Sequence, residues 1–171
     1  LIPDERAPLR AAIAEASASD LVVSCGGVSI GAHDHVKAVL AELGAKLQFW
    51  RVNMKPGKPL AVATLPTSNC VFFALPGNPV ATLVCFTEYV QPSLLRQAGR
   101  TRLFPARVMA RLEEPIQAGA GSRFQFLRGV LSREGQGYSV RALPKQSSGA
   151  LSSLLHQALI LLPPGESRKA G

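Results

Sequence analysis

Three short segments place charged or amide side chains among the glycines and prolines of tight turns. Residues 26–34 read GGVSIGAHD and carry one carboxylate; we call them the glycine loop. Residues 55–59, the lysine turn, read KPGKP and carry two cations, and residues 75–79, the asparagine turn, read LPGNP. Each segment adjoins an apolar, strand-like stretch. Three such turns predict strand ends that converge on one anionic ligand.

The glycine loop has the composition of a phosphate-binding loop. Gly26, Gly27 and Gly31 permit positive φ angles and let the backbone approach a ligand closely. Ser29 adds a hydroxyl donor, and the helix expected next would offer its N-terminal N–H groups to an anion. Asp34 has two interpretations, a first-turn carboxylate that complements the helix dipole or an oxygen ligand for Mg²⁺.

The lysine turn fixes two ammonium groups on a stiff backbone. Lys55 and Lys58 bracket a Pro-Gly pair, and a second proline follows. Such a pair suits an oxyanion such as phosphate or molybdate; the alternative is an ordinary solvated basic turn. Arg51 precedes Lys55 by four residues, on the same face of an expected strand over 47–54, and would join the cationic lining.

The asparagine turn predicts a capped helix. Asn78 is a favourable N-cap residue, and Pro79 is favourable at the first helical position. The cap alone explains Asn78, and the exposed N–H groups of the helix start remain for a ligand.

The elements that position these turns alternate between helix and strand. Val36, Val39, Leu40 and Leu43 form an amphipathic stripe that ends at Gly44. Helices are predicted over 7–17, 36–43 and 79–99, the last bent near Pro92, and strands over 21–25, 47–54, 60–64 and 70–75. This order predicts an α/β sheet with helices on its faces. Because a strand normally precedes the first helix of such a sheet, we expect the chain to be the C-terminal fragment of a longer protein.

The pattern changes after residue 99. Strand-like segments over 105–112, 123–131, 138–143 and 158–162 are separated by glycine-rich turns, and only residues 152–156 suggest a helix. We therefore expect two units, the α/β sheet domain over 1–101 and a small all-β domain over 102–171.

Composition excludes several classes of protein. The 171 residues are 47% hydrophobic, enough for a core, but no apolar run approaches the roughly 18 residues of a membrane span. The first residues show no basic region followed by a hydrophobic stretch, so we expect no secretion signal. Three widely spaced cysteines form no Cys-x-x-Cys pair, which favours buried thiols in a cytoplasmic protein over zinc or disulfides.

Charge is concentrated in the second unit. Residues 100–171 carry 11 lysines and arginines against 4 acidic residues. This excess would attract nucleic acid, a membrane surface or a phosphorylated small molecule. We expect the small molecule, because the arginines are scattered along strands without a basic run or interleaved aromatic residues.

The order of the motifs resembles one family. GGVSxGxxD, W[RK]xxxKPGKP and LPGNP are followed by FxRG at 126–129 and by a QxS turn at 146–148. Together they resemble the molybdopterin molybdenumtransferase family, which includes the C-terminal domain of gephyrin. The resemblance implies the latter part of a molybdopterin-binding α/β domain, followed by a small β-barrel-like domain.

The reaction implied by this resemblance is metal insertion. Adenylated molybdopterin and molybdate would react in the presence of Mg²⁺ to give molybdenum cofactor and AMP. The resemblance also implies a homodimer whose site is completed by N-terminal regions beyond this chain, so we expect the chain alone to be inactive.

The resemblance assigns roles to individual residues. Asp34 and Asp4 would be catalytic and hold the metal, and Lys55 would be catalytic. The implied substrate-binding residues are Gly26, Gly27, Ser29, Gly31, Arg51, Lys58, Pro76, Gly77, Asn78, Arg128 and Ser148.

Two other functions are compatible with the motifs. A molybdopterin adenylyltransferase shares the α/β unit and a related Gly-Gly loop, but the lysine turn, the asparagine turn and the β domain disfavour it. A non-catalytic, gephyrin-like scaffold would present a groove to a partner peptide, and no groove is visible in the sequence. The choice between molybdate and tungstate is open.

Overall fold

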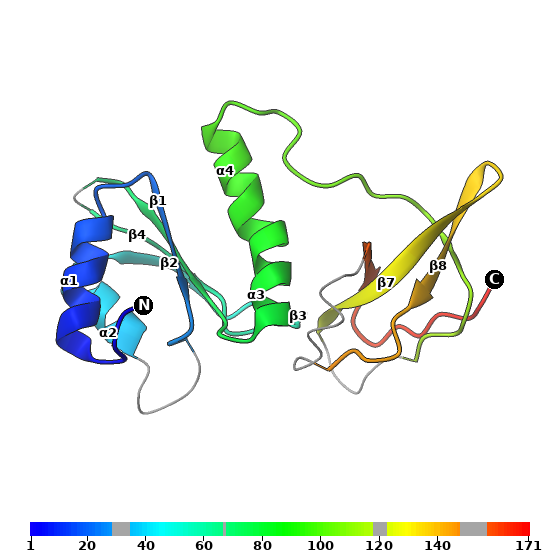
Figure 1. Ribbon diagram of the computed structural model, residues 1–171, viewed down its shortest axis with the longest axis horizontal. Helices are drawn as coiled ribbons and strands as arrows, with labels where there is room; N and C mark the ends of the chain where they lie inside the picture. Colours follow the sequence, from blue (N-terminus) through cyan, green and yellow to red (C-terminus); the bar gives the residue numbers. More distant parts are fainter. Residues whose placement is uncertain (29–34, 67, 118–122, 148–156) are drawn as a thin grey trace.

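A computed structural model describes residues 1–28, 35–66, 68–117, 123–147 and 157–171. In these residues two sheets stand on either side of a helical column formed by α3 and α4 (Figure 1). Among the described residues, no helix combines the length and apolar character needed to cross a membrane.

The first sheet has the strand order β1-β5-β4-β2. Strands β1 and β5 are parallel, whereas β4 is antiparallel to both β5 and β2. The strands are β1 (Leu21–Cys25), β2 (Lys46–Trp50), β4 (Ala61–Thr64) and β5 (Val71–Leu75). The α/β sheet domain expected from the sequence is confirmed.

Helices cover both faces of this sheet, because β5 is apolar on both sides. Phe72 and Ala74 face a core that includes α1 (Arg6–Ala16) and α2 (His35–Glu42). Phe73 packs in the opposite core with Cys85 of α3 (Pro79–Cys85). The predicted stripe of α2 is confirmed, since Val36, Val39 and Leu40 are buried.

The long helix predicted after the asparagine turn, with a bend near Pro92, changes its helix type just before that residue. A π-helical turn, η1 (Phe86–Val90), separates α3 from α4 (Gln91–Gln97). Its Gln91 N–H donates to the Phe86 carbonyl, five residues back. Pro92 has no N–H, and its ring would crowd the carbonyl four residues earlier, so a wider turn at this point is physically reasonable.

The second sheet has the order β3-β7-β8-β6, with β9 also paired to β7. Its strands are β3 (Met54–Lys55), β6 (Arg111–Leu112), β7 (Phe124–Glu134), β8 (Gly137–Ala142) and β9 (Ala158–Leu162). Its core contains Leu112, Ile116, Val140 and Leu162. The expected β-rich second half is therefore observed, but β3 comes from the first half of the chain.

Two predicted strands are wrong in extent. The strand expected over 47–54 ends at Trp50, because Arg51 has a φ angle of 67° and Met54 joins the other sheet. Arg51 and Lys55 therefore do not share a strand face. The strand expected over 105–112 is reduced to Arg111–Leu112, the two residues that pair with β8. The helix suggested over 152–156 lies outside the described residues.

Candidate functional site

The described start of the glycine loop, the lysine turn and the asparagine turn lie near one another at one edge of the first sheet. Strands β1, β5 and β2 run in the same direction, so their carboxyl ends lie together. The Gly26 N–H donates to the Leu75 carbonyl over 3.0 Å, which joins the start of the glycine loop to the end of β5. A Cβ at Gly77 would lie 3.4 Å from the Gly26 Cα, so these two turns pack backbone against backbone.

The asparagine turn has the predicted capping geometry. The Asn78 side-chain oxygen accepts from the N–H groups of Val80 and Ala81 over 3.1 and 3.3 Å, and Pro79 occupies the first turn. Thr82 donates from its hydroxyl to the carbonyl of Asn78 over 2.9 Å. The turn is thereby fixed to the start of α3.

The lysine turn leaves the first sheet and contacts the second. The Lys55–Pro56 peptide bond is cis. Lys55 pairs with Gln125 of β7 through the short strand β3, while the Lys58 carbonyl accepts from Val52 N–H over 2.9 Å. Gly57 has a φ angle of 110°, and a Cβ there would lie 2.6 Å from Cys85 Sγ. The turn therefore rests directly on α3.

A pocket of about 630 Å³ lies between this turn and the second sheet. The lysine turn, the asparagine turn, the start of α3 and the second sheet line it, and none of the described lining residues is acidic. The lining consists of Lys55, Pro56, Gly57, Lys58, Pro59, Pro76, Asn78, Ala81, Arg123, Gln125, Phe126, Leu127, Arg128, Gln146 and Ser147.

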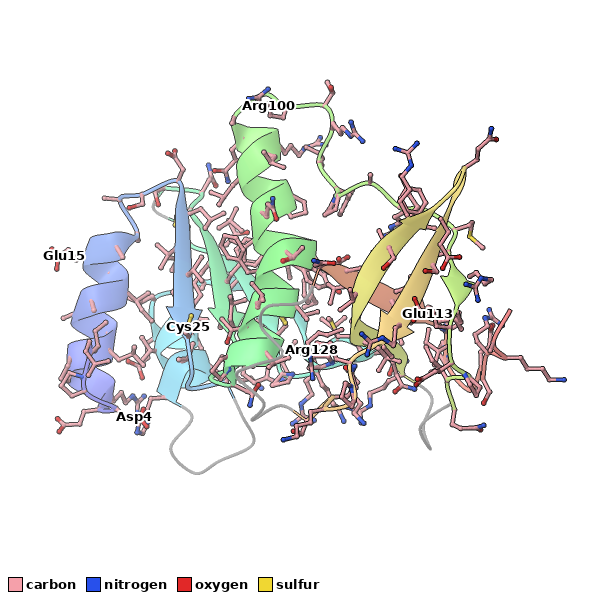
Figure 2. All side chains as sticks on the ribbon, turned by 45° about the vertical axis from the view of Figure 1, so that its right-hand side comes forward. Asp4, Glu15, Cys25, Arg100, Glu113 and Arg128 are labelled. Carbon is pink, nitrogen blue, oxygen red and sulfur yellow. The ribbon has the colours of Figure 1, made fainter. Side chains whose placement is uncertain are left out.

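Arg128 is the most buried polar group of this pocket. Its side chain is 1% exposed, and Figure 2 shows it between the two sheets near the base of α3. Nη2 donates to the carbonyls of Lys145 and Ser147 over 3.1 and 3.4 Å. Among the described residues, no acceptor serves the buried Nε atom. Burial lowers the pKa of Arg128, as expected when a cation loses its hydration.

In the described residues, carboxylates form ion pairs with several arginines outside the pocket but with none of the cations that line it. The ion pairs in the described part of the chain join Arg6 and Arg10 to Glu42, Arg111 to Glu134, Arg141 to Glu113 and Arg168 to Glu166. Neither the two lysines nor Arg123 and Arg128 take part in them. A buried cation without a carboxylate is costly unless an anion is bound, so this pocket has the electrostatics of an anion site.

The structure brings together only some of the predicted site residues. Lys55, Lys58, Pro76, Asn78 and Arg128 line the pocket. Gly26, Gly27 and Gly77 lie at the adjoining sheet edge without lining it, and Arg51 does not line it either. Asp4 is exposed, just before α1, where Figure 2 labels it. Ser29, Gly31, Asp34 and Ser148 lie outside the described residues.

Sequence reasoning missed four polar residues of the pocket. Arg123 and Gln125 flank the start of β7, and Gln146 and Ser147 lie in the turn after β8. The one available signal was the QxS turn, which contains Gln146 and read as an ordinary polar turn.

A pocket between a mixed α/β sheet and a β sheet, lined by cations and by no acidic residue among those described, defines a class of anion-binding protein. Matches to family models identify the family within this class. The molybdopterin-binding domain family, described as probable molybdopterin binding, matches residues 1–96, and the MoeA C-terminal region, domain IV, matches residues 109–171. The chain belongs to this molybdopterin-binding, MoeA-type family.

Relatives and solved structures agree with this assignment. The chain is 38% identical to the molybdopterin molybdenumtransferase of a Nostoc species and 37% identical to that of Haemophilus influenzae, over 98% and 94% of its length. It spans 39% and 38% of those two proteins. The crystal structure of the molybdopterin biosynthesis moeA protein of Pyrococcus horikoshii superposes with a TM-score of 0.76 at 29% identity, covering 98% of this chain and 39% of that one.

Proposed function

We propose that this chain forms the oxyanion-binding part of a molybdopterin molybdenumtransferase, an enzyme of molybdenum cofactor biosynthesis. The observation that carries the proposal is Arg128, a buried guanidinium that shares a pocket with Lys55 and Lys58 and has no carboxylate partner in the part of the chain that the structure describes. The names of the relatives point to the same activity.

The proposed substrates are molybdate and adenylated molybdopterin, and the products are molybdenum cofactor and AMP. Both substrates are anions that repel each other in water. A pocket that holds cations from the lysine turn and from β7 would neutralise this repulsion and orient the reactants. Interactions in such a pocket are stronger than in water because the surrounding dielectric is lower.

The protein residues supply position and charge in this scheme. The dithiolene sulfurs of the pterin would be the nucleophiles toward molybdenum, so the pocket needs no nucleophilic side chain. Lys55 and Lys58 would face the oxyanion from the lysine turn and Arg128 from β7. The start of α3, capped by Asn78, places its N-terminal dipole beside the same pocket.

Mg²⁺ is part of the proposal, with Asp34 and Asp4 as its expected ligands. Carboxylate oxygens suit this ion, which usually keeps several waters and binds substrate phosphates as well. The described residues alone do not provide a complete site, since they contain no group of three or more potential metal ligands. We therefore assign no reaction step to the ion. A homodimer and a cytoplasmic location are likewise proposed.

AMP release from adenylated molybdopterin tests the function. The natural polypeptide that carries this sequence is assayed at its full length, with and without molybdate, in the presence of Mg²⁺. We expect molybdate-dependent release that is lost in Asp34→Ala and in Lys55→Ala, but retained in Lys46→Ala, which removes an exposed lysine of β2. Absence of release from the intact protein would refute the proposal and favour the scaffold or the adenylyltransferase.

A further inference from the structure

The side-chain amide of Gln146 forms hydrogen bonds with the backbone of Arg128, as a neighbouring strand would. Its Oε1 accepts from the Arg128 N–H over 3.0 Å, and its Nε2 donates to the Arg128 carbonyl over 2.8 Å. Nε2 also donates to the Leu143 carbonyl over 2.8 Å. The Leu143 N–H also donates to the Arg128 carbonyl over 2.8 Å, so the amide adds a second donor to that carbonyl and supplies the acceptor for the Arg128 N–H.

The residues on either side of Gln146 hold the other end of Arg128. The carbonyls of Lys145 and Ser147 accept from Nη2 of the guanidinium. Segment 145–147 therefore binds Arg128 at both its backbone and its charged end. Since Lys145 and Ser147 are exposed, their carbonyls owe their position to the buried contacts of Gln146 between them.

An arginine side chain has several rotatable bonds, and an ion pair usually fixes its direction. Arg128 has no such pair among the described residues. The two carbonyls of segment 145–147 are therefore the described acceptors that orient the guanidinium, while the buried Nε has no partner among the described residues.

We infer that Gln146 is a positioning residue that aims the guanidinium of Arg128 into the pocket and so sets its affinity for a tetrahedral oxyanion. The inference that this ligand is an oxyanion rests on the proposed function. The positioning itself rests on the hydrogen bonds of the structure.

A double-mutant cycle separates positioning from general stability. Molybdate affinity is measured by calorimetry for the chain and for its Gln146→Met, Arg128→Lys and doubly substituted variants. We expect Gln146→Met to raise the Kd roughly tenfold, and to have an effect of less than about twofold once Arg128 is lysine. Equal effects in both backgrounds would overturn the inference.

A measurement without ligand tests the same point. NMR relaxation of the Arg128 Nε–H group is measured, and its resonance is identified by its loss in Arg128→Lys. We expect this group to be as rigid as the backbone in the wild type and to be mobile in Gln146→Met. The matched control is Gln157→Ala, since Gln157 is exposed in the same sheet region and its backbone bond to Gly129 survives the change. Gln146→Asn, which keeps a polar amide that is too short for both contacts, serves if Gln146→Met does not fold.

The affinity measurement and the resonance measurement test the oxyanion pocket and the positioning of Arg128 separately. No molybdate binding by the wild type would refute the proposed oxyanion pocket, while the resonance still decides the positioning. A rigid Arg128 Nε–H in a folded Gln146 variant would overturn the positioning, whatever the affinity of the wild type.

Discussion

Lys55 and Gln125 face each other across a parallel strand pair, although one belongs to the lysine turn and the other to the second sheet. The Phe124 N–H strengthens this junction by donating to the Asn53 carbonyl over 3.1 Å. The first cation of the pocket is therefore held by the sheet that also carries Arg128. Relative movement of the two sheets would carry Lys55 with the second one.

Removal of either lysine of the turn should weaken oxyanion binding. We expect Lys55→Ala and Lys58→Ala each to raise the Kd for molybdate by about tenfold at low salt, and by less at high salt because ions screen the exposed part of the interaction. Calorimetric titration at two ionic strengths measures this, with Lys46→Ala as the control. Equal losses in Lys46→Ala would show that only net charge matters.

Arg128 should favour binding at the expense of stability. Replacement of an unpaired buried charge by an apolar side chain of similar length is often neutral or stabilising. We expect Arg128→Met to abolish molybdate binding and to leave the free energy of unfolding unchanged, or raised by about 1 kcal/mol. Denaturant titration and calorimetry measure the two quantities. A loss of more than about 2 kcal/mol would instead mark Arg128 as a structural residue.

Gly57→Ala should disrupt the lysine turn for two separate reasons. The new Cβ would meet Cys85 Sγ at 2.6 Å, and the φ angle of 110° is unfavourable for any residue with a side chain. We expect a loss of about 2 kcal/mol or more in unfolding free energy. Cys85→Ala in the same chain should restore only part of it, since the backbone strain remains. Complete restoration would show that the steric clash is the whole effect.

Two substitutions of Asn78 test its role as helix cap and its position in the pocket separately. Asn78→Ala removes the acceptor for two helix N–H groups and should cost about 1 kcal/mol of stability. Asn78→Asp keeps this acceptor but brings a negative charge to an anion pocket, so stability should be retained while molybdate affinity falls. Thermal unfolding and calorimetric titration compare the two variants. Unchanged affinity in Asn78→Asp would place the anion away from the start of α3.

Local patterns predicted the parts of the fold that depend on neighbouring residues. Residues 21–25 form the expected strand, and Asn78 makes the expected cap, because a run of β-branched residues and a capping side chain act over short distances. The alternation of side chains over 47–54 predicted one continuous strand, which is wrong. The structure has a register shift between Leu47 and Phe49 and a left-handed backbone at Arg51, and neither feature can be recognised in the sequence.

The pocket depends on contacts between residues far apart in the sequence. Arg128 reads as an ordinary strand arginine, and its burial results from segment 145–147 folding over it. Arg123 enters the pocket only because β3 pairs with the start of β7. Such pairings between distant segments have no local signal, so only the family resemblance singled out Arg128.

The buried thiol of Cys85 should make stability fall in alkaline solution. Burial raises the pKa of Cys85 from 9.0 to about 12. Between these values the unfolded chain has lost the proton and the folded chain has kept it, so a rise in pH favours unfolding. We expect the stability contributed by this neutral thiol to be complete below pH 9 and lost as pH rises toward about 12.

Cys85→Val provides the comparison, since it keeps an apolar side chain of similar size at the same site. The pH dependence of unfolding free energy, measured by denaturant titration, should be shallower in this variant over that range. Cys70 is buried as well and its pKa is also raised, so part of the slope should persist. Identical slopes in the two proteins would mean that Cys85 does not titrate on unfolding.

The π-helical turn at Phe86–Val90 makes the helix tolerant of a change in chain length at this one place. A π turn holds about one residue more than an α turn, so deletion of one residue there would restore plain α-helix geometry. The residues beyond it would keep nearly the same faces, because the wider turn, rather than a rotation of the helix, accommodates the extra residue. The same deletion within α4 would instead rotate everything beyond it by about 100° about the helix axis, including the exit of the chain at Gly99. A one-residue deletion in the π turn should therefore damage the pocket less than the same deletion in α4.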